Sequence, residues 1–253
     1  MSPIAIALIV FVCVFGGAAI GITLNARLPD HHLEGPSADV VKLVLGLIGT
    51  MAAVVLGLLI ASAKGTYDTQ VSDVAQLSAG ILQLDRLLAN YGPETKDARD
   101  SLHQDVINNV EEIWPKDSVT SASLAPLEDR AKAEAFFVSI QKLSPQTDAQ
   151  RFARSQALQI ATDIYHTRLL MFVQQGSAVS LPFLIVLVSW LVLLFIGFGL
   201  LTPFNGTVVT ALLVGALSVA GALFLILEMD RPYSGLMRIS SAPLLSALAQ
   251  MNQ

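Results

Sequence analysis

The sequence predicts an all-α membrane protein with four transmembrane helices and a helical insert between the second and the third. Of its 253 residues, 53% are hydrophobic and 14% are charged, well below the roughly 25% charged residues of soluble domains. Four apolar runs contain no Asp, Glu, Lys or Arg: 4–24, 43–63, 181–201 and 208–227. Each is long enough to cross the ~30 Å hydrocarbon core of a bilayer.

These runs divide the chain into four parts. We expect a transmembrane hairpin over residues 1–64, a helical cytoplasmic domain over 65–178, a second hairpin over 179–228 and a tail over 229–253. The first run has no Lys or Arg before it and exceeds the apolar core of a secretory signal, so we interpret it as a retained helix.

The run 43–63 carries the strongest functional signal. Its small residues recur every three or four positions and therefore share one face of a helix. They are Gly46, Thr50, Ala53, Gly57 and Ala61. Such a face lets another helix approach closely, or it lines a narrow passage shared by several subunits. Lys42 and Lys64 bracket the run, either as charges at two pore mouths or as side chains that reach out of the membrane.

The loop before this run contains His31, His32 and Glu34. Adjacent histidines lack the i, i+4 spacing that places two metal ligands on one helical face. We therefore predict no metal site, and a solvated or inter-subunit loop at the outer mouth. Ser37 or Asp39 could cap the helix that follows.

The insert has the apolar periodicity of four helices and no alternating strand pattern. The first helix ends at Tyr91, the second spans about 94–114 and the third about 126–143. Ser144 as N-cap and Pro145 as first residue would open the fourth, with core candidates from Phe152 to Leu169.

Catalytic and cofactor motifs are missing from the sequence. It has no Gly-rich phosphate loop, HExxH, GxSxG or CxxC. Its single cysteine excludes an internal disulfide, and its net charge of −5 does not suggest nucleic-acid binding. We predict neither an enzyme nor a cofactor.

In the tail, Asp230, Arg231 and Arg238, together with Glu228, could form an ion-pair network that docks it at the base of the last span. Docking is the simpler interpretation, and a role in gating is the alternative. All but two of the 15 Lys and Arg, namely Arg27 and Lys42, fall in the insert, counted here from Lys64, and in the tail. The positive-inside rule then places both termini and the insert in the cytoplasm. In a bacterial cell, the protein would lie in the inner membrane and the short loops would face the periplasm.

Two stretches resemble the signature sequences of the bestrophin-like bacterial membrane proteins, a family with a distant likeness to bestrophin channels. They are HHLEGPSADVVKLVLGLIGTMAAVVLGLLIASAKGTYD at residues 31–68 and DRPYSGLMRIS at 230–240. The resemblance implies a pentameric ion channel with four spans per subunit, a helical cytoplasmic part and a pore lined by the second span. Its partners would be membrane lipid, permeant inorganic ions and further copies of the chain.

The chain departs from bestrophins in its pore face. Bestrophin pores have a neck of bulky apolar residues, whereas the face here is Gly, Thr and Ala. A hydrophobic gate would need Ile48, Met51 or Leu58 to turn inward, or it is absent. Selectivity stays open, because the two lysines favour anions and the acidic insert favours cations.

We therefore predict a homo-oligomeric ion channel. The alternative is a non-conducting membrane adaptor or sensor, in which the insert binds a partner and the small face only packs. A transporter is less favoured, because the spans do not form paired broken helices around a charged site in mid-membrane.

Overall fold

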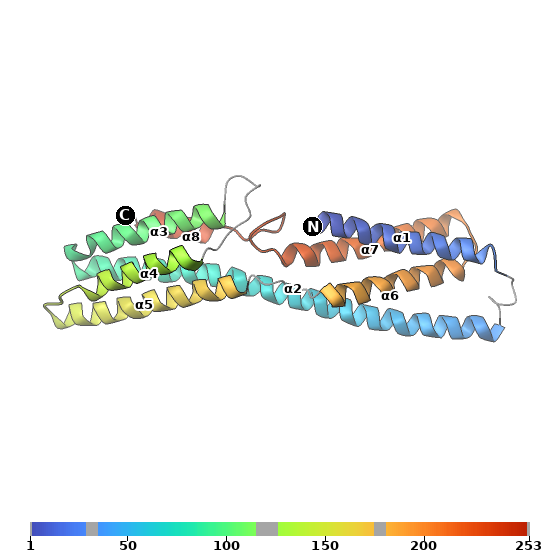
Figure 1. The fold of residues 1–253 in the computed structure, drawn as a ribbon, viewed down its shortest axis with the longest axis horizontal. Coiled ribbons are helices and arrows are strands. Elements are labelled where there is room, and N and C mark those ends of the chain that lie inside the picture. The colour runs from blue at the N-terminus through green and yellow to red at the C-terminus, as the bar shows by residue number, and fades with distance from the viewer. Residues whose placement is uncertain (1, 29–34, 115–125, 175–180, 252–253) are drawn as a thin grey trace. The chain divides into compact units, whose positions relative to one another are not determined.

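The computed structural model describes residues 2–28, 35–114, 126–174 and 181–251, which form helices and no strand. The elements are α1 (Pro3–Asn25), α2 (Gly35–Tyr91), the short 3-10 helix η2 (Pro93–Thr95), α3 (Lys96–Ile113), α4 (Pro126–Gln141), α5 (Asp148–Val173), α6 (Leu181–Leu200), α7 (Gly206–Met229) and α8 (Ala242–Met251) (Figure 1). Four of them, α1, α2, α6 and α7, are long and apolar enough to cross a membrane. The predicted all-helical class with four long apolar helices is confirmed.

The chain divides into two compact units. The first comprises Met1–Thr66 and Ser177–Asp230, and the second comprises Tyr67–Gly176 and Arg231–Gln253. The first unit therefore holds α1, α6, α7 and the apolar part of α2. The second holds the polar part of α2 with η2, α3, α4, α5 and α8. The continuous helix α2 contributes to both units.

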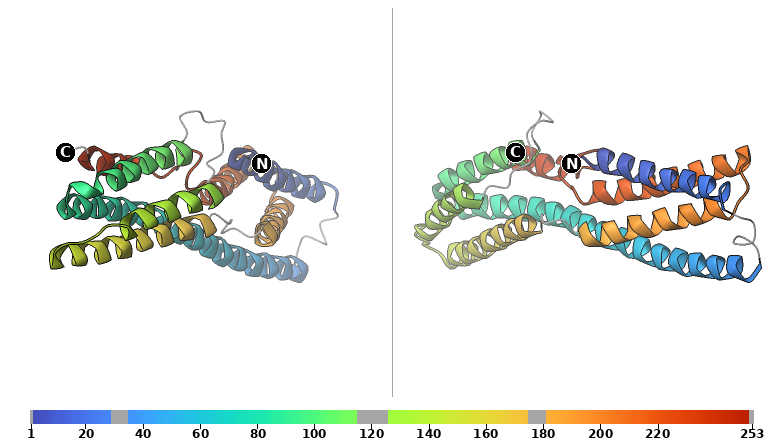
Figure 2. Two further views of the ribbon diagram at one scale, coloured as in Figure 1. Left: turned by 60° about the vertical axis from the view of Figure 1, so that its left-hand side comes forward. Right: turned by 45° about the vertical axis from the view of Figure 1, so that its right-hand side comes forward.

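In the first unit, α1 packs against α6 and α7 (Figures 1 and 2). Gly21 of α1 and Gly199 of α6 make the closest approach. A Cβ added to Gly21 would lie 2.1 Å from the carbonyl oxygen of Ile196, and one added to Gly199 would lie 2.4 Å from that of Ala18. The two backbones touch because neither glycine has a side chain, which is the usual basis of tight helix packing in lipid.

The apolar part of α2 packs against α6 along one side of the helix. The side chain of Leu45 occupies the space beside Gly197 of α6, and Leu194 of α6 lies 3.7 Å from the position of a Cβ on Gly49. Ala52 and Ala63 on the same side of α2 are also buried. Most of the remaining surface of this span is exposed.

In the second unit, four helices pack around the polar part of α2 (Figure 2). The side chains of α2 that enter this core recur at spacings of three and four, as the sequence predicts. They are Val74, Leu77, Ile81, Leu84 and Leu88.

Three local predictions are wrong. The helix through residues 43–63 begins at Gly35, so neither Ser37 nor Asp39 precedes it as a cap. The last helix of the insert begins at Asp148, because the hydroxyl of Thr147, and not Ser144, accepts a hydrogen bond from the backbone N–H of Gln150. Two predicted core residues lie outside the packed core: Phe152 near the start of α5 is 67% exposed and Leu169 near its end is 44% exposed.

The contact between α1 and α6 can be tested with two glycines that are five residues apart. Gly21→Ala should destabilise the protein by about 1–3 kcal/mol, because a methyl group there collides with backbone that cannot rotate away. Gly16→Ala is the control, because nothing lies within 4 Å of its added Cβ. The measurement is the thermal unfolding midpoint of each purified variant. Equal midpoints for the two variants would contradict the close contact.

Candidate functional site

The five predicted pore-lining residues of α2 are all exposed on the single chain. They lie on a different side of the helix from Ala52, Leu59 and Ala63, which are buried. Only 6% of the most apolar stretch of α2 is buried, against 28% for α1, 39% for α6 and 22% for α7. The span with the small face is therefore the one that its own chain covers least.

The two lysines lie on the small face. Lys42 precedes Gly46 by four residues and Lys64 follows Ala61 by three, so all of these side chains leave α2 on the same side. Both lysines are exposed. One face of α2 thus carries small residues between two lysines. Lysines that only anchor the two ends of a lipid-facing helix do not have to share a face with its small residues.

Each lysine has an acidic residue one helical turn away. Asp39 Oδ1 lies 3.5 Å from Lys42 Nζ, with both side chains largely exposed. Asp68 follows Lys64 by four residues, the other spacing at which helical side chains meet. The lysines therefore do not act as isolated positive charges at either end. Asp68 was missed at the sequence level because it lies beyond the apolar run.

Bulky side chains occupy the exposed surface beside the small face. These are chiefly Leu43, Leu47, Val54 and Leu58. Of the three gate candidates, Met51 and Leu58 are exposed and Ile48 is half-buried. On the small face itself, the hydroxyl of Thr50 donates to the carbonyl oxygen of Gly46 at 2.9 Å. This bond leaves the lone pairs of the hydroxyl oxygen available as acceptors.

The outer-loop residues His31, His32 and Glu34 lie outside the residues that the structure describes. Within the described residues, no group of three or more His, Cys, Asp or Glu side chains could hold a metal ion.

Aromatic and amide groups, which we call the tail clasp, attach the tail to α2, α3 and α5. The hydroxyl of Tyr233 donates to Gln70 Oε1, and Gln70 Nε2 donates to Gln174 Oε1 at 3.4 Å. Trp114 Nε1 donates to the carbonyl oxygen of Ile239 at 2.7 Å, and its ring meets that of Tyr233 edge-on, with centroids 5.9 Å apart. The tail clasp comprises Gln70, Trp114, Gln174, Tyr233 and Ile239.

The charged residues predicted to dock the tail lie at the end of α7 and in the segment that follows it. Asp230 follows the last residue of α7 as its C-cap, and Arg231 and Arg238 are exposed. The carbonyl oxygen of Arg231 accepts a turn hydrogen bond from Ser234. Sequence reasoning missed Tyr233 and its partners. The sequence offered one signal for this contact: Tyr233 is an aromatic residue in a charged tail, and its hydroxyl group can form a hydrogen bond when the ring is buried.

Asp73 lies on α2 one turn beyond Gln70. Burial raises the pKa of its carboxyl group, and within the described part of the chain its buried Oδ2 has no hydrogen-bond partner. Burial, and then the nearby charge of Asp73, raise the pKa of Tyr233. Tyr233 therefore stays protonated and keeps donating its hydrogen bond across the physiological pH range.

A family comparison decides the relationship of this chain to known proteins. The model of the Bestrophin-like domain matches residues 12–244, which include most of α1, all of α2–α7 and the tail clasp. The chain belongs to the bestrophin-like family. The suspected resemblance is thereby confirmed over nearly the whole chain. No curated protein and no solved structure matches it.

The hydrogen bond of Tyr233 can be tested against a second buried tyrosine. Tyr233→Phe leaves Gln70 Oε1 without its donor inside the protein and should destabilise it by about 1–3 kcal/mol. Tyr91→Phe is the control, because the buried hydroxyl of Tyr91 has no partner within the described residues. Its removal should leave the unfolding midpoint unchanged or slightly raised. A loss in Tyr91→Phe as large as that in Tyr233→Phe would contradict the clasp.

The raised pKa of Asp73 predicts a pH-dependent effect on stability. The folded protein holds the proton more tightly than the unfolded chain, whose carboxyl has its ordinary value of 3.8. The contribution of the protonated Asp73 carboxyl group to stability is therefore fully present below that value. It is lost as the pH rises through the pKa that Asp73 has in the folded protein. Asp73→Asn should raise the unfolding midpoint at pH 7, and this gain should shrink as pH falls toward 4. A gain that is independent of pH would show that desolvation of the carboxylate is not its cause.

Proposed function

We propose that the protein is a homo-oligomeric ion channel of the bacterial inner membrane, with a pore lined by α2. The observation that carries the proposal is the exposure of its small face. All five small residues are uncovered by their own chain, and the apolar stretch of this span is the least buried of the four. In an assembly of identical subunits, this face would meet its copies around a common axis.

A pore explains why the two exposed faces of α2 differ. Bulky side chains such as Leu47 and Leu58 suit lipid or a neighbouring helix. Small residues leave backbone carbonyls near the axis, where they can replace part of the hydration shell of an ion. The exposed hydroxyl oxygen of Thr50 adds a side-chain acceptor on the same face.

Family membership supports the same assignment. The second span lines the pore in the bestrophin plan, and α2 holds that position here within a domain match of 12–244. We extend the proposal to a pentamer with both termini in the cytoplasm, surrounded by membrane lipid and passing inorganic ions. It assigns the chain no catalytic role.

The adaptor alternative would place an exposed apolar patch on the insert. The largest exposed apolar group there is at the end of α5, where Leu169, Leu170, Phe172 and Val173 are uncovered. This turn ends fewer than ten residues before the apolar helix α6 begins. We assign this group to the bilayer interface, so it does not favour an adaptor.

Ion flux into liposomes that contain the purified protein tests the channel. Ala53→Trp should abolish flux because an indole would fill the passage from every subunit. Val54→Trp is the matched control at the same depth, since its side chain leaves the helix about 100° away from that of Ala53. It should retain flux.

Three outcomes separate the hypotheses. Flux in the wild type that only Ala53→Trp abolishes supports α2 as the pore helix. Flux that survives in an assembled Ala53→Trp variant removes α2 from the pore. A folded wild-type oligomer without flux in any salt gradient shifts the assignment to the adaptor.

A further inference from the structure

The small face of α2 offers a passing ion one polar side chain. Within residues 43–63, only Thr50 and Ser62 carry a hydroxyl, amide or charged group. Ser62 follows Thr50 by twelve residues, so its side chain leaves the helix about 120° away from that of Thr50. The backbone N–H groups of a spanning helix are used within the helix itself. Between the two lysines, Thr50 is therefore the polar side chain that the small face presents.

The hydrogen bond of Thr50 fixes which of its atoms can meet an ion. Its hydroxyl group donates to the carbonyl oxygen of Gly46 at 2.9 Å, and the residue is exposed. A hydroxyl group has one proton to donate and two lone pairs that accept. The proton is already used, and the lone pairs are not. A cation can bind this oxygen as it stands, whereas an anion would have to break the bond to Gly46.

The charges at the ends of the small face do not reverse this preference. Asp39 Oδ1 lies 3.5 Å from Lys42 Nζ, and Asp68 follows Lys64 by four residues, so each end carries both signs of charge. Thr50 lies about 12 Å along the helix from Lys42 and about 21 Å from Lys64. In a water-filled passage, both distances exceed the Debye length of about 8 Å at physiological ionic strength. The oxygen of Thr50 therefore dominates the electrostatics at its own depth.

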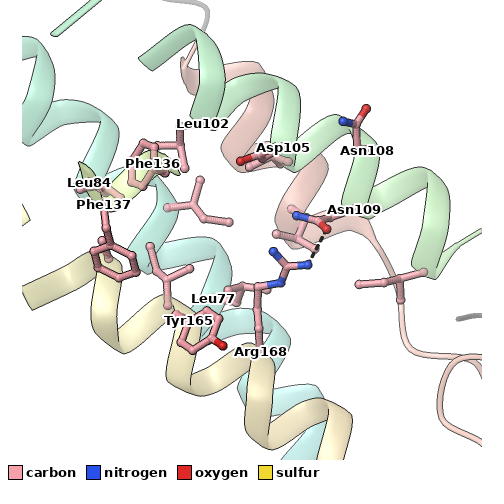
Figure 3. A pocket seen from close by; sticks show the side chains of 16 residues that line it. Leu77, Leu84, Leu102, Asp105, Asn108, Asn109, Phe136, Phe137, Tyr165 and Arg168 are labelled. Carbon is pink, nitrogen blue, oxygen red and sulfur yellow. Dashed lines mark hydrogen bonds between the residues drawn. The ribbon is translucent and has the colours of Figure 1, made fainter. Parts of the chain in front are cut away.

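The helical insert adds a second preference of the same sign. Residues 65–178 carry 15 Asp and Glu against 10 Lys and Arg. Among the basic residues, Arg168 of α5 turns to α3, where its Nη2 donates to Asn109 Oδ1 at 2.6 Å (Figure 3). Among the acidic residues, Asp97 and Asp100 of α3 are exposed. A net negative charge raises the local concentration of cations and lowers that of anions.

We propose that the hydroxyl oxygens of Thr50, one from each subunit, form a ring that binds a monovalent inorganic cation and makes the channel cation-selective. The inference rests on the proposed channel with α2 as its pore helix. Oxygen atoms around a pore replace part of the hydration shell of a cation. The ring is neutral, whereas Ca²⁺ sites include carboxylates and Mg²⁺ releases its water reluctantly. Residues 43–63 contain no carboxylate, so a monovalent cation fits the small face better than a divalent one.

Reversal potentials across planar lipid bilayers test the ion class. The bilayer holds the purified full-length oligomer between KCl solutions of unequal concentration. We expect the permeability to K⁺ to exceed that to Cl⁻ by about tenfold, a difference equal to roughly one good hydrogen bond. With MgCl₂ in place of KCl, the permeability to the cation should fall by a similar factor. Equal permeability to Mg²⁺ and K⁺ would overturn the monovalent assignment.

Four variants test the role of the Thr50 oxygen. Thr50→Val keeps the shape of the side chain and removes its oxygen, so it should lower the ratio of K⁺ to Cl⁻ permeability by about tenfold. Thr50→Ala removes the same oxygen without placing a larger apolar group in the passage, and should have the same effect. Thr50→Ser keeps the hydroxyl group and should keep the ratio. Ser62→Val is the matched control, because it removes an exposed hydroxyl group from another side of α2, and it should not change the ratio.

Each result decides the inference. A preference for K⁺ that is lost in Thr50→Ala and kept in Thr50→Ser and Ser62→Val supports it. A wild type that prefers Cl⁻, or a preference for K⁺ that Thr50→Ala retains, overturns it. If Ala53→Trp still abolishes the current in either case, α2 lines the pore and only the assignment of Thr50 is wrong. A folded oligomer that passes no current in any salt overturns this inference and the channel together.

Discussion

Hydrocarbon offers no hydrogen-bond partners to a polypeptide backbone, and most features of this protein follow from that constraint. Every segment that crosses it must satisfy its own N–H and C=O groups, which makes the four apolar runs helices. Helices in lipid gain little from hiding apolar side chains, so their association depends on close contact. Gly21 and Gly199 provide that contact between α1 and α6, where an added methyl group would meet backbone atoms. The small residues Gly46, Thr50, Ala53, Gly57 and Ala61 of α2 are exposed in the described part of the chain, and we propose that further copies of the chain cover them.

The helix α2 runs without a break from Gly35 to Tyr91, and its apolar part continues into the helical insert. Its small face lies within the apolar part, and Gln70 of the tail clasp follows Lys64 by six residues. The clasp fixes the signature tail to the helix that we assign to the pore. Because Gln70 and Tyr233 are both buried, their hydrogen bond is shielded from competing water, and the tail holds a defined position against α2.

The insert has polar groups in and beside its core where a simple bundle would have apolar ones. Asp85 is buried and paired with Arg99 in two hydrogen bonds, of 2.7 and 3.0 Å. Asp73 holds a buried carboxylate oxygen without a hydrogen-bond partner in the described chain, and Arg168 bridges α5 and α3 beside a cavity. Such groups reduce stability when incompletely satisfied.

The helical class, the four apolar helices, the core periodicity of α2 and the bestrophin-like resemblance could all be predicted from the sequence, because length, hydropathy and motif spacing are local properties. It misplaced the start of α5, since Ser144 and Thr147 are both acceptable caps and only the packing of the helix selects one. It could not find the tail clasp, whose residues Gln70, Trp114 and Tyr233 are far apart along the chain. Nor could it show which side of α2 is covered by α6. Contacts between distant segments depend on how the helices pack against one another, which no local pattern in the sequence specifies.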